Sequence, residues 1–409
     1  MQSKQSTAIL AIGVALAALS SNIAASGFAL IEQNASGMVN AYAGGAALAE
    51  DASTIFFNPA GMSRLNGKQL VVAGHLIKPS IKFTGTGLTI PDSSNMGGDV
   101  GSVAFVPNAY FAMEMNPSIW FGLGINSPFG LQTEYDTLWV GRRHASKSSI
   151  KTINLNPSVA YRVNDALSLG AGINYQYIRG ELTSDAVTAG GISTVKGSDS
   201  AWGYNLGVLY NITQQTRLGF AYRSAINYTL DGDVTFSNPS PPMYQNGPVT
   251  LAIEVPDSFS SSVLHKIRDQ WDLLADLTWT GWSKFQRLEV IRETGSTISS
   301  TQENWQDTWR VAIGANHHYS ERWTSRIGLA YDQSPVSDQF RTARIPDSDR
   351  TWFSLGGQYK PFRDSAIDLG YAHIWLKNST INATNPAPTL AGSYKSRIDI
   401  LSVQYTQSF

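Results

Sequence analysis

Apolar residues alternate with polar or small residues over long stretches of this chain, and this period of two constrains its fold more than any other feature. In 153–163 the odd positions carry Ile, Leu, Pro, Val, Tyr and Val, whereas the even positions carry Asn, Ser, Ala and Arg. Stretches 169–177 and 202–210 repeat the pattern. Successive side chains of a β-strand point to opposite faces, so each stretch predicts a strand with one apolar face.

The length and the polar face of these strands favour a membrane barrel over a soluble sandwich. Most stretches run for about ten residues or more, which suits a tilted strand that crosses a bilayer. Their polar faces carry Gly, Ser, Asn and Ala rather than Lys and Glu, which suggests a lumen. We predict about fourteen strands, at 68–80, 101–115, 118–127, 149–163, 166–180, 200–211, 214–236, 247–267, 270–290, 306–318, 321–333, 350–360, 364–378 and 393–409.

The connections between these strands alternate between short turns and long loops. Asn116-Pro117 and Asn164-Asp165 are turn-like, whereas 181–198 and 334–349 are long and polar. Short periplasmic turns and long external loops are typical of antiparallel outer-membrane barrels, and an even strand number leaves both termini in the periplasm. The predicted fold is therefore all-β, a transmembrane antiparallel β-barrel.

The first 25 residues predict a secretory signal peptide. Lys4 precedes the apolar run Ala8–Leu19, and Ala24-Ala25 offers small residues for cleavage. A membrane anchor is the alternative, but the run is shorter than the ~20 residues that a spanning helix needs. Secretion and the strand pattern together predict the outer membrane of a Gram-negative cell.

Composition excludes several functions. The 30 Lys+Arg and 31 Asp+Glu residues give a net charge of -1, so no basic field exists to attract nucleic acid. The chain has no Cys, and its six His show no metal-ligand spacing. No GxSxG motif occurs, and no Ser/His pair of an outer-membrane phospholipase can be identified. We predict no enzymatic activity, no cofactor and no metal.

The chain ends on an aromatic residue in an apolar row. Leu401, Val403, Tyr405 and Phe409 share one face of the last predicted strand, although Gln407 interrupts the row. A terminal Phe is what barrel assembly generally requires. Phe409 is therefore the predicted contact with the barrel assembly machinery.

Residues 26–67 contain no long alternating stretch and predict a plug. A barrel of about fourteen strands is wider than the eight that side chains can fill and narrower than open channels of 16–18 strands. The middle of this segment is rich in Ala and Gly, which allows short helices to pack against a barrel wall. The expected domains are a signal peptide at 1–25, a hatch at 26–67 and a barrel at 68–409.

Two stretches resemble the FadL/TodX family of hydrophobic-compound transporters. The segment Ser26–Leu65 ("SGFALIEQNASGMVNAYAGGAALAEDASTIFFNPAGMSRL") resembles the family's N-terminal hatch, and 127–163 resembles its third external loop. The resemblance implies a monomeric 14-stranded barrel that carries long-chain fatty acids or aromatic hydrocarbons across the outer membrane. Apolar cargo, lipopolysaccharide and outer-membrane lipid are the implied partners.

The resemblance also implies roles for the hatch motif. Asn58, Pro59 and Ala60 match the family's NPA motif, which lies where the hatch faces a gap in the wall. Pro59 stiffens the bend, the Asn58 side chain can cap it or bond the wall, and Phe56 and Phe57 can wedge against cargo. A plain turn into the first strand is the alternative.

The resemblance also implies a lateral gate at the third strand, Ile119–Phe129, which in the family carries a kink that opens the wall, and a capture groove is expected in the loop that follows. Lateral release lets greasy cargo pass from groove to lipid without meeting water, and Gly122, Gly124 and Pro128 weaken the ladder there. Lumen packing is an alternative reason for the glycines. The predicted capture residues are Phe129, Leu131, Leu138, Trp139, Arg142, Arg143 and Lys147.

The cargo itself is left open. The basic loop residues can hold a carboxylate, which favours fatty acids over aromatic hydrocarbons, or they can contact lipopolysaccharide phosphates. An adhesive or structural barrel is a further alternative. Alternation turns five arginines inward, where some are expected to pair with Asp272, Asp276 and Asp368; they are Arg162, Arg217, Arg223, Arg310 and Arg326.

Overall fold

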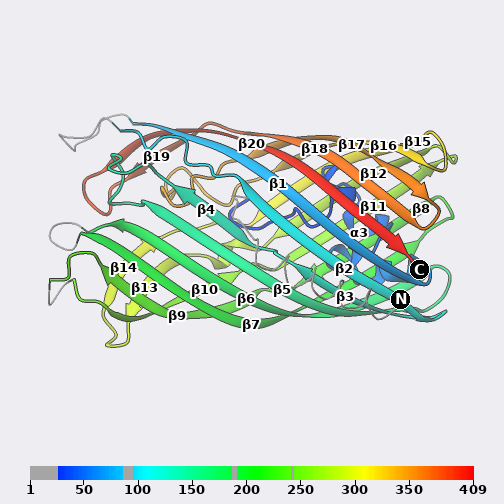
Figure 1. Ribbon diagram of the computed structural model, residues 1–409, viewed down its shortest axis with the longest axis horizontal. Helices are drawn as coiled ribbons and strands as arrows, with labels where there is room; N and C mark the ends of the chain where they lie inside the picture. Colours follow the sequence, from blue (N-terminus) through cyan, green and yellow to red (C-terminus); the bar gives the residue numbers. More distant parts are fainter. Residues whose placement is uncertain (1–25, 86–94, 187–190, 241–243) are drawn as a thin grey trace.

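The protein is a closed antiparallel β-barrel with short helices inside it (Figure 1). The computed structural model describes residues 26–85, 95–186, 191–240 and 244–409, so the predicted signal peptide lies outside the described residues. The first strand, β1 (Lys68–Gly85), pairs along its length with the last, β20 (Leu390–Ser408), and this pairing closes the barrel. Closure gives the first and last strands of the described wall a partner on each side.

The wall has 14 strands, as predicted, although the described residues form 20 separate strand segments because six wall strands are each divided in two. The uninterrupted strands besides β1 and β20 are β2 (Ala104–Asn116), β5 (Lys147–Arg162), β6 (Leu167–Asp185), β7 (Ile192–Asn211), β16 (Trp323–Asp332) and β17 (Arg350–Phe362). The interrupted ones are β3 (Ile119–Asn126) with β4 (Gly130–Glu134), β8 (Thr216–Arg223) with β9 (Ile226–Phe236), β10 (Gly247–Val255) with β11 (Ser258–Ile267), β12 (Trp271–Thr280) with β13 (Arg287–Arg292), β14 (Thr297–Gln302) with β15 (Thr308–His318), and β18 (Ser365–Leu376) with β19 (Ser379–Ala383).

The alternating residues face as the pattern predicts. In β5 the apolar Leu155 and Val159 are exposed on the outer surface, whereas Asn154 and Asn156 are completely buried on the lumen side. The outer surface is therefore apolar and the interior polar, which is the reverse of a soluble sandwich.

The segment before β1 fills the lumen near the end of the barrel where the C-terminus lies (Figure 1). It contains α2 (Ala35–Met38), α3 (Gly45–Leu48), α4 (Thr54–Phe57) and the 3₁₀ helix η1 (Pro59–Arg64); a second, η2 (Trp282–Lys284), follows β12. We call residues 26–67 the hatch. No helix in the described part of the chain is long and apolar enough to cross a membrane.

Wall glycines let the hatch approach the barrel closely. A Cβ at Gly219 would lie 1.9 Å from the Ala46 carbonyl oxygen, and one at Gly328 would lie 2.1 Å from the Asn40 carbonyl carbon. Both neighbours are backbone atoms that cannot give way to a side chain. The glycines in the polar rows therefore serve hatch contact as well as strand packing.

Candidate functional site

Three hollows follow one another from the long-loop end of the barrel to the hatch. The vestibule is lined by loop-proximal residues such as Arg143, Phe236 and Arg292. The outer chamber shares Leu182, Val195, Leu288 and Arg344 with the vestibule. The inner chamber lies between the wall and the hatch residues Phe56, Phe57 and Pro59.

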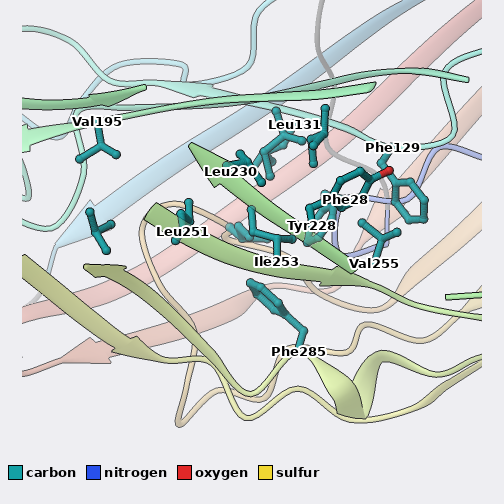
Figure 2. Close-up of a cluster of buried hydrophobic side chains, with 14 of the residues drawn as sticks. Phe28, Phe129, Leu131, Val195, Tyr228, Leu230, Leu251, Ile253, Val255 and Phe285 are labelled. Atoms are coloured by element: carbon teal, nitrogen blue, oxygen red, sulfur yellow. The ribbon is translucent and has the colours of Figure 1, made fainter. Parts of the chain in front are cut away.

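The outer chamber has an almost entirely apolar lining. Leu131, Val195, Leu230, Leu251 and Ile253 come from four different strands and gather around it (Figure 2). Each lies on the inward face of its strand and is less than a tenth exposed. The chamber therefore offers an apolar group a lining that is favourable compared with water.

Five aromatic side chains separate the outer chamber from the inner one. The Phe28 ring lies 4.8 Å from Trp282, 5.7 Å from Phe285 and 5.9 Å from Phe129, between ring centroids. Trp305 lies 4.9 Å from Trp282. Phe28 and Phe285 line the outer chamber, whereas Phe129 and Trp282 line the inner one. We call these five residues the aromatic partition.

Three charged residues line the outer chamber: Lys196 of β7, and Glu303 and Arg344, which lie in segments between strands. Arg344 donates to the carbonyl oxygens of Lys147 and Thr183, each at 3.3 Å. Glu303 accepts from the indole N–H of Trp305 at 3.1 Å. Burial raises the pKa of Glu303 well above that of an ordinary glutamate, and the indole hydrogen bond and the positive charge of Arg344 offset only part of this rise.

Sequence reasoning missed Glu303 and Arg344. Each lies in a segment without alternation, so no local signal points either side chain inward. The fold of the 333–349 loop, between β16 and β17, brings Arg344 beside β5 and β6.

Asn58 both caps the bend and bonds the wall, so the structure realises the two options that the sequence left open. Its Oδ1 accepts from the N–H of Ala60 at 3.1 Å at the start of η1. Its Nδ2 donates to the carbonyl oxygens of Ala46 at 2.7 Å and Val208 at 2.9 Å. The motif therefore fastens α3 to β7, where the β6–β7 ladder is continuous.

The wall is interrupted after β3, close to Pro128. The ladder between β2 and β3 ends at Ala109, and β4 pairs with β5 but has no ladder with β2. We call this interruption the wall break. The wall break lies beside Pro128, whereas the NPA motif lies on a different part of the wall. A gating role for Pro128 stays a prediction.

Residues 28–33 of the hatch cover the wall break from inside. The N–H of Leu30 donates to the carbonyl oxygen of Pro128 at 2.7 Å, and that of Gly130 donates to Phe28 at 2.9 Å. On the other side, Asn108 of β2 donates to the carbonyl oxygen of Glu32 at 3.0 Å. The hatch thus supplies a short strand-like seal to the otherwise unpaired edge.

Gly122 and Gly124 face the hatch rather than the break. A Cβ at Gly122 would lie 2.4 Å from Met62 Sδ and 2.7 Å from Ile55 Cδ1. One at Gly124 would lie 3.1 Å from Tyr110. The packing alternative therefore accounts for both glycines, and a gating role for them stays a prediction.

The predicted capture residues do not form one groove. Phe129 and Leu131 line the two chambers, whereas Trp139 is fully buried in another cluster and stacks on Tyr135 at 3.7 Å. Leu138 is 65% exposed. The basic residues are engaged elsewhere: Arg142 pairs with Asp185, Lys147 with Glu134 and Glu181, and Arg143 donates to the Ala387 carbonyl.

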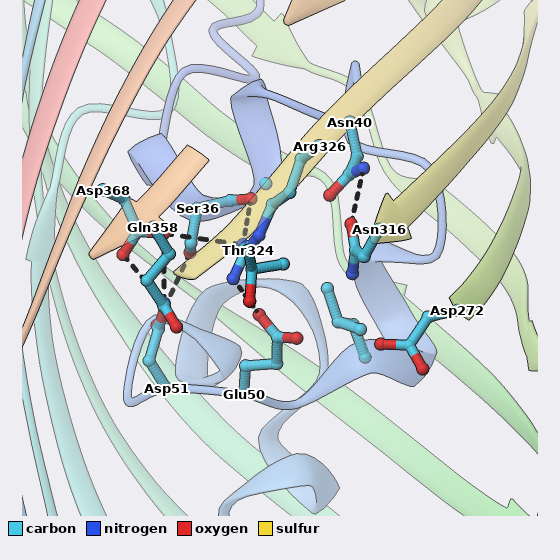
Figure 3. A network of polar contacts seen from close by, with 12 residues as sticks. Ser36, Asn40, Glu50, Asp51, Asp272, Asn316, Thr324, Arg326, Gln358 and Asp368 are labelled. Atoms are coloured by element: carbon cyan, nitrogen blue, oxygen red, sulfur yellow. Dashed lines mark hydrogen bonds and ion pairs between the residues drawn. The ribbon is translucent and has the colours of Figure 1, made fainter. Parts of the chain in front are cut away.

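The five inward arginines all donate to backbone carbonyl oxygens of the hatch. Arg223 reaches Phe56 at 2.9 Å, and Arg326 reaches Ser36 at 2.9 Å. Arg326 also pairs with Glu50 at 2.9 Å and Asp368 at 3.6 Å, in a polar network between hatch and wall (Figure 3). The remaining contacts are Arg162 with Ser63, Arg217 with Ala47 and Leu48, and Arg310 with Ala41.

The expected pairing of these arginines with inward acids holds for one of the three named acids. Asp368 pairs with Arg326, whereas Asp272 pairs with Lys266 at 3.5 Å and His318 at 2.8 Å. Asp276 accepts from Ser262 and from Thr278. Hatch carbonyls replace the other acids as arginine partners, because the hatch occupies the lumen that alternation alone leaves empty.

Comparison with known proteins agrees with this architecture. A family model described as outer membrane protein transport protein (OMPP1/FadL/TodX) matches residues 16–409. The long-chain fatty acid transport protein of Escherichia coli K12 is 31% identical, with 91% of this chain and 93% of that protein covered.

Two solved structures extend the comparison. A FadL homologue of Pseudomonas aeruginosa superimposes with a TM-score of 0.86 and 27% identity, covering 93% of this chain and 99% of that one. The toluene transporter TodX of Pseudomonas putida reaches a TM-score of 0.73 at 19% identity, covering 93% and 99%, which is a likeness of fold.

Proposed function

This chain belongs to the OMPP1/FadL/TodX family of outer membrane transport proteins, and from that premise we propose that it carries long-chain fatty acids. The family consists of transport channels for hydrophobic compounds and not of enzymes, and its place is the outer membrane. Our proposed route runs from the vestibule through the outer chamber, past the aromatic partition and the hatch, to the wall break.

The observation that carries this proposal is an apolar chamber with one buried guanidinium at its edge. Burial of an acyl chain is worth about 0.8 kcal/mol per CH₂, so the lining of the outer chamber suits a long alkyl tail. Arg344 can hold the carboxylate by charge-assisted hydrogen bonds. A protonated Glu303 would leave Arg344 without a competing anion inside the chamber. The 31% identity to a long-chain fatty acid transport protein supports the same cargo.

Lateral release through the wall break is the second part of the proposal. The seal at 28–33 rests on a few backbone bonds and lacks a complete ladder, so the cost of moving it is small beside that of opening an intact wall. Cargo that passes the seal would enter lipid directly. Phe56 and Phe57 line the inner chamber on this route.

The proposed transport function also implies an oligomeric state and partners in the outer membrane. We propose a monomer, because the closed barrel offers no free edge for a second copy. Phe409 is the proposed contact with the barrel assembly machinery. Lipopolysaccharide is the proposed neighbour of the half-buried basic side chain of Arg143.

Aromatic hydrocarbons are the alternative cargo class, because the apolar lining of the outer chamber suits them as well as it suits an alkyl tail. A neutral hydrocarbon, however, would supply no anion to the Arg344 charge. If the protein carries neither cargo, the remaining alternative is that it serves as an adhesive or structural barrel.

Uptake by cells that lack their own transporter tests the proposal. Such cells would express the unsubstituted protein, Arg344→Gln, or Asn58→Ala with Pro59→Ala, and receive labelled oleate or toluene. We expect oleate uptake to be restored by the unsubstituted protein and to fall at least about tenfold in Arg344→Gln. Loss of uptake in the double variant, with normal barrel assembly, would support the hatch-gated route. Toluene uptake without oleate uptake would favour the alternative cargo, and uptake of neither would leave the adhesive barrel.

A further inference from the structure

Arg310 of β15 is a buried cation that is only partly satisfied. Its Nη2 donates to the carbonyl oxygen of Ala41 in the hatch at 2.6 Å. Within the described part of the chain, its Nε and Nη1 have no hydrogen-bond partner, although the residue is only 6% exposed. Unpaired N–H donors on a buried charged group cost folding free energy. This cost suggests that a bound ligand pairs with them during transport.

These free donors lie at the inner chamber together with a second one. Arg310 and Trp352 both line that chamber, and the guanidinium lies 5.4 Å from the centre of the Trp352 ring. The indole N–H of Trp352 is also buried and without a partner among the described residues. Three unpaired N–H groups on two neighbouring side chains are complementary to an acceptor with more than one oxygen.

Hydrogen bonding, rather than net charge, distinguishes Arg310 from the other ionic groups of the inner chamber. The described lining has three cations, Arg223, Arg310 and Arg350, and two acids, Asp276 and Asp332, and Asp347 behind Arg350 balances the third cation. The oxygens of Asp276 already accept from Ser262 and Thr278. Arg350 is paired with Asp347, and Arg223 donates to Phe56 and Asn174. Asp332 is the acid that partly offsets Arg310.

We propose that Arg310 and Trp352 form a second carboxylate site, which takes the ionised head group of a fatty acid after it has passed the aromatic partition. This inference rests on the proposed function and adds a resting place beyond the outer chamber. The apolar part of the same chamber, formed by Phe56, Phe57 and Phe129, would hold the alkyl tail.

The position of the site sets the direction of the tail. β15 belongs to the tenth wall strand and β3 to the third, so the two lie half-way round the 14-stranded barrel from each other. A head group at Arg310 therefore leaves the tail to extend across the chamber toward Pro128 and Leu30, which line it at the wall break. The tail, rather than the head group, would meet the lipid first.

Photo-crosslinking in intact outer membranes tests this site. The probe is a radiolabelled fatty acid with a diazirine next to its carboxyl group, and mass spectrometry locates the adducts. With the unsubstituted protein we expect adducts both around Arg344 and around Arg310 and Trp352. In Arg310→Gln the inner adducts should fall at least about tenfold while the outer ones persist, and Arg310→Lys should retain most of them.

Arg217→Gln is the matched control, because Arg217 also donates to hatch carbonyls but does not line the inner chamber. It should keep the inner adducts. If the inner adducts are absent from the unsubstituted protein, persist in Arg310→Gln, or disappear equally in Arg217→Gln, the second site is wrong. Oleate uptake measured on the same cells separates the two proposals: uptake without inner adducts rejects only this site, whereas absence of uptake and of all adducts rejects fatty acid transport.

Discussion

At the scale of single residues, the hatch is held mainly by side chains that bond its backbone. The five inward arginines and Asn58 donate to hatch carbonyl oxygens that its short helices leave unpaired. Helices of four residues cannot satisfy their own carbonyl groups, so the wall has to supply donors. Such bonds contribute about 1 kcal/mol for the neutral Asn58 and about 1.5–3 kcal/mol for a charged arginine, which holds the hatch against the wall.

Replacing Asn58 should loosen the hatch and leave the barrel unchanged. Asn58→Ala removes the bonds to Ala46 and Val208 and the cap on η1, a loss of about 1–2 kcal/mol. Hydrogen–deuterium exchange should become about tenfold faster for hatch amides near 45–61, with little change in β6 or β7. Asn382→Ala, at an exposed position of β19, is the control. Equal protection of the hatch in both variants would contradict the anchoring role.

Fatty acid binding should depend on pH through Glu303. Its pKa is raised, so Glu303 is neutral below that pKa and becomes negative as the pH rises through it. The negative form competes with a carboxylate for Arg344. Oleate affinity of the purified protein should therefore fall roughly tenfold from pH 6 to pH 9. Glu303→Gln keeps an acceptor for Trp305 and should remove this dependence; an identical pH profile in the variant would refute the assignment.

At the scale of elements, the wall break and its cover form one unit. β3 stops at Asn126, β4 starts at Gly130, and residues 28–33 bond to both Pro128 and Asn108 across the opening. The cover lies at the beginning of the hatch, 25 to 30 residues before Asn58 of the NPA motif in the sequence. Movement at the break therefore needs only residues 28–33 to leave, while Asn58 can stay bonded to β7.

A disulfide across the break should lock it. Ala29 and Phe129 form an isolated antiparallel bridge, and the chain has no Cys of its own. Directly opposed residues of this kind lie about 4.5–5.5 Å apart at Cα, within the range of a disulfide. Oleate uptake by Ala29→Cys with Phe129→Cys should be lost on oxidation and recovered on reduction.

The control for the lock is Lys82→Cys with Asp99→Cys, at another isolated bridge away from the break. Its uptake should not respond to oxidation. Undiminished uptake by the oxidised Ala29–Phe129 pair, with the disulfide verified by mass spectrometry, would show that cargo leaves by another path.

At the scale of the whole molecule, closure joins the two ends of the chain. β1 and β20 pair from Gln69 and Ser408 to Gly85 and Gly392, and Phe409 exchanges backbone bonds with Lys68. The same strand that completes the barrel therefore carries the terminal aromatic residue. Assembly and closure depend on one segment.

Deleting Phe409 should reduce assembly more than stability. The deletion removes the bonds at 2.8 and 3.3 Å to Lys68, which is a small part of the β1–β20 ladder. We expect less folded barrel in the outer membrane, measured as the heat-modifiable band on gels, and a nearly unchanged melting temperature of the purified remainder. Phe409→Tyr should assemble normally. Full assembly of the deletion variant would exclude the proposed recognition of Phe409.

The sequence by itself determined the barrel, because strand alternation is a local property. The predicted strand at 149–163 corresponds to β5 at Lys147–Arg162, and the predicted single strand at 247–267 covers both β10 and β11. Alternation predicts where strands lie but does not register their interruptions. The hatch followed from the lack of alternation and from the resemblance in Ser26–Leu65.

Only the tertiary structure decided which side chains contact one another inside the lumen. Arg310 donates a hydrogen bond to Ala41, and Arg344 donates one to Ser148, although about two hundred residues or more separate the two partners in the sequence. Whether an inward arginine contacts an acid, a carbonyl or an open chamber depends on the hatch and on strands remote in sequence. A period of two says only that a side chain points inward. The same reason explains why Trp139 and Phe129, close in sequence, belong to different clusters.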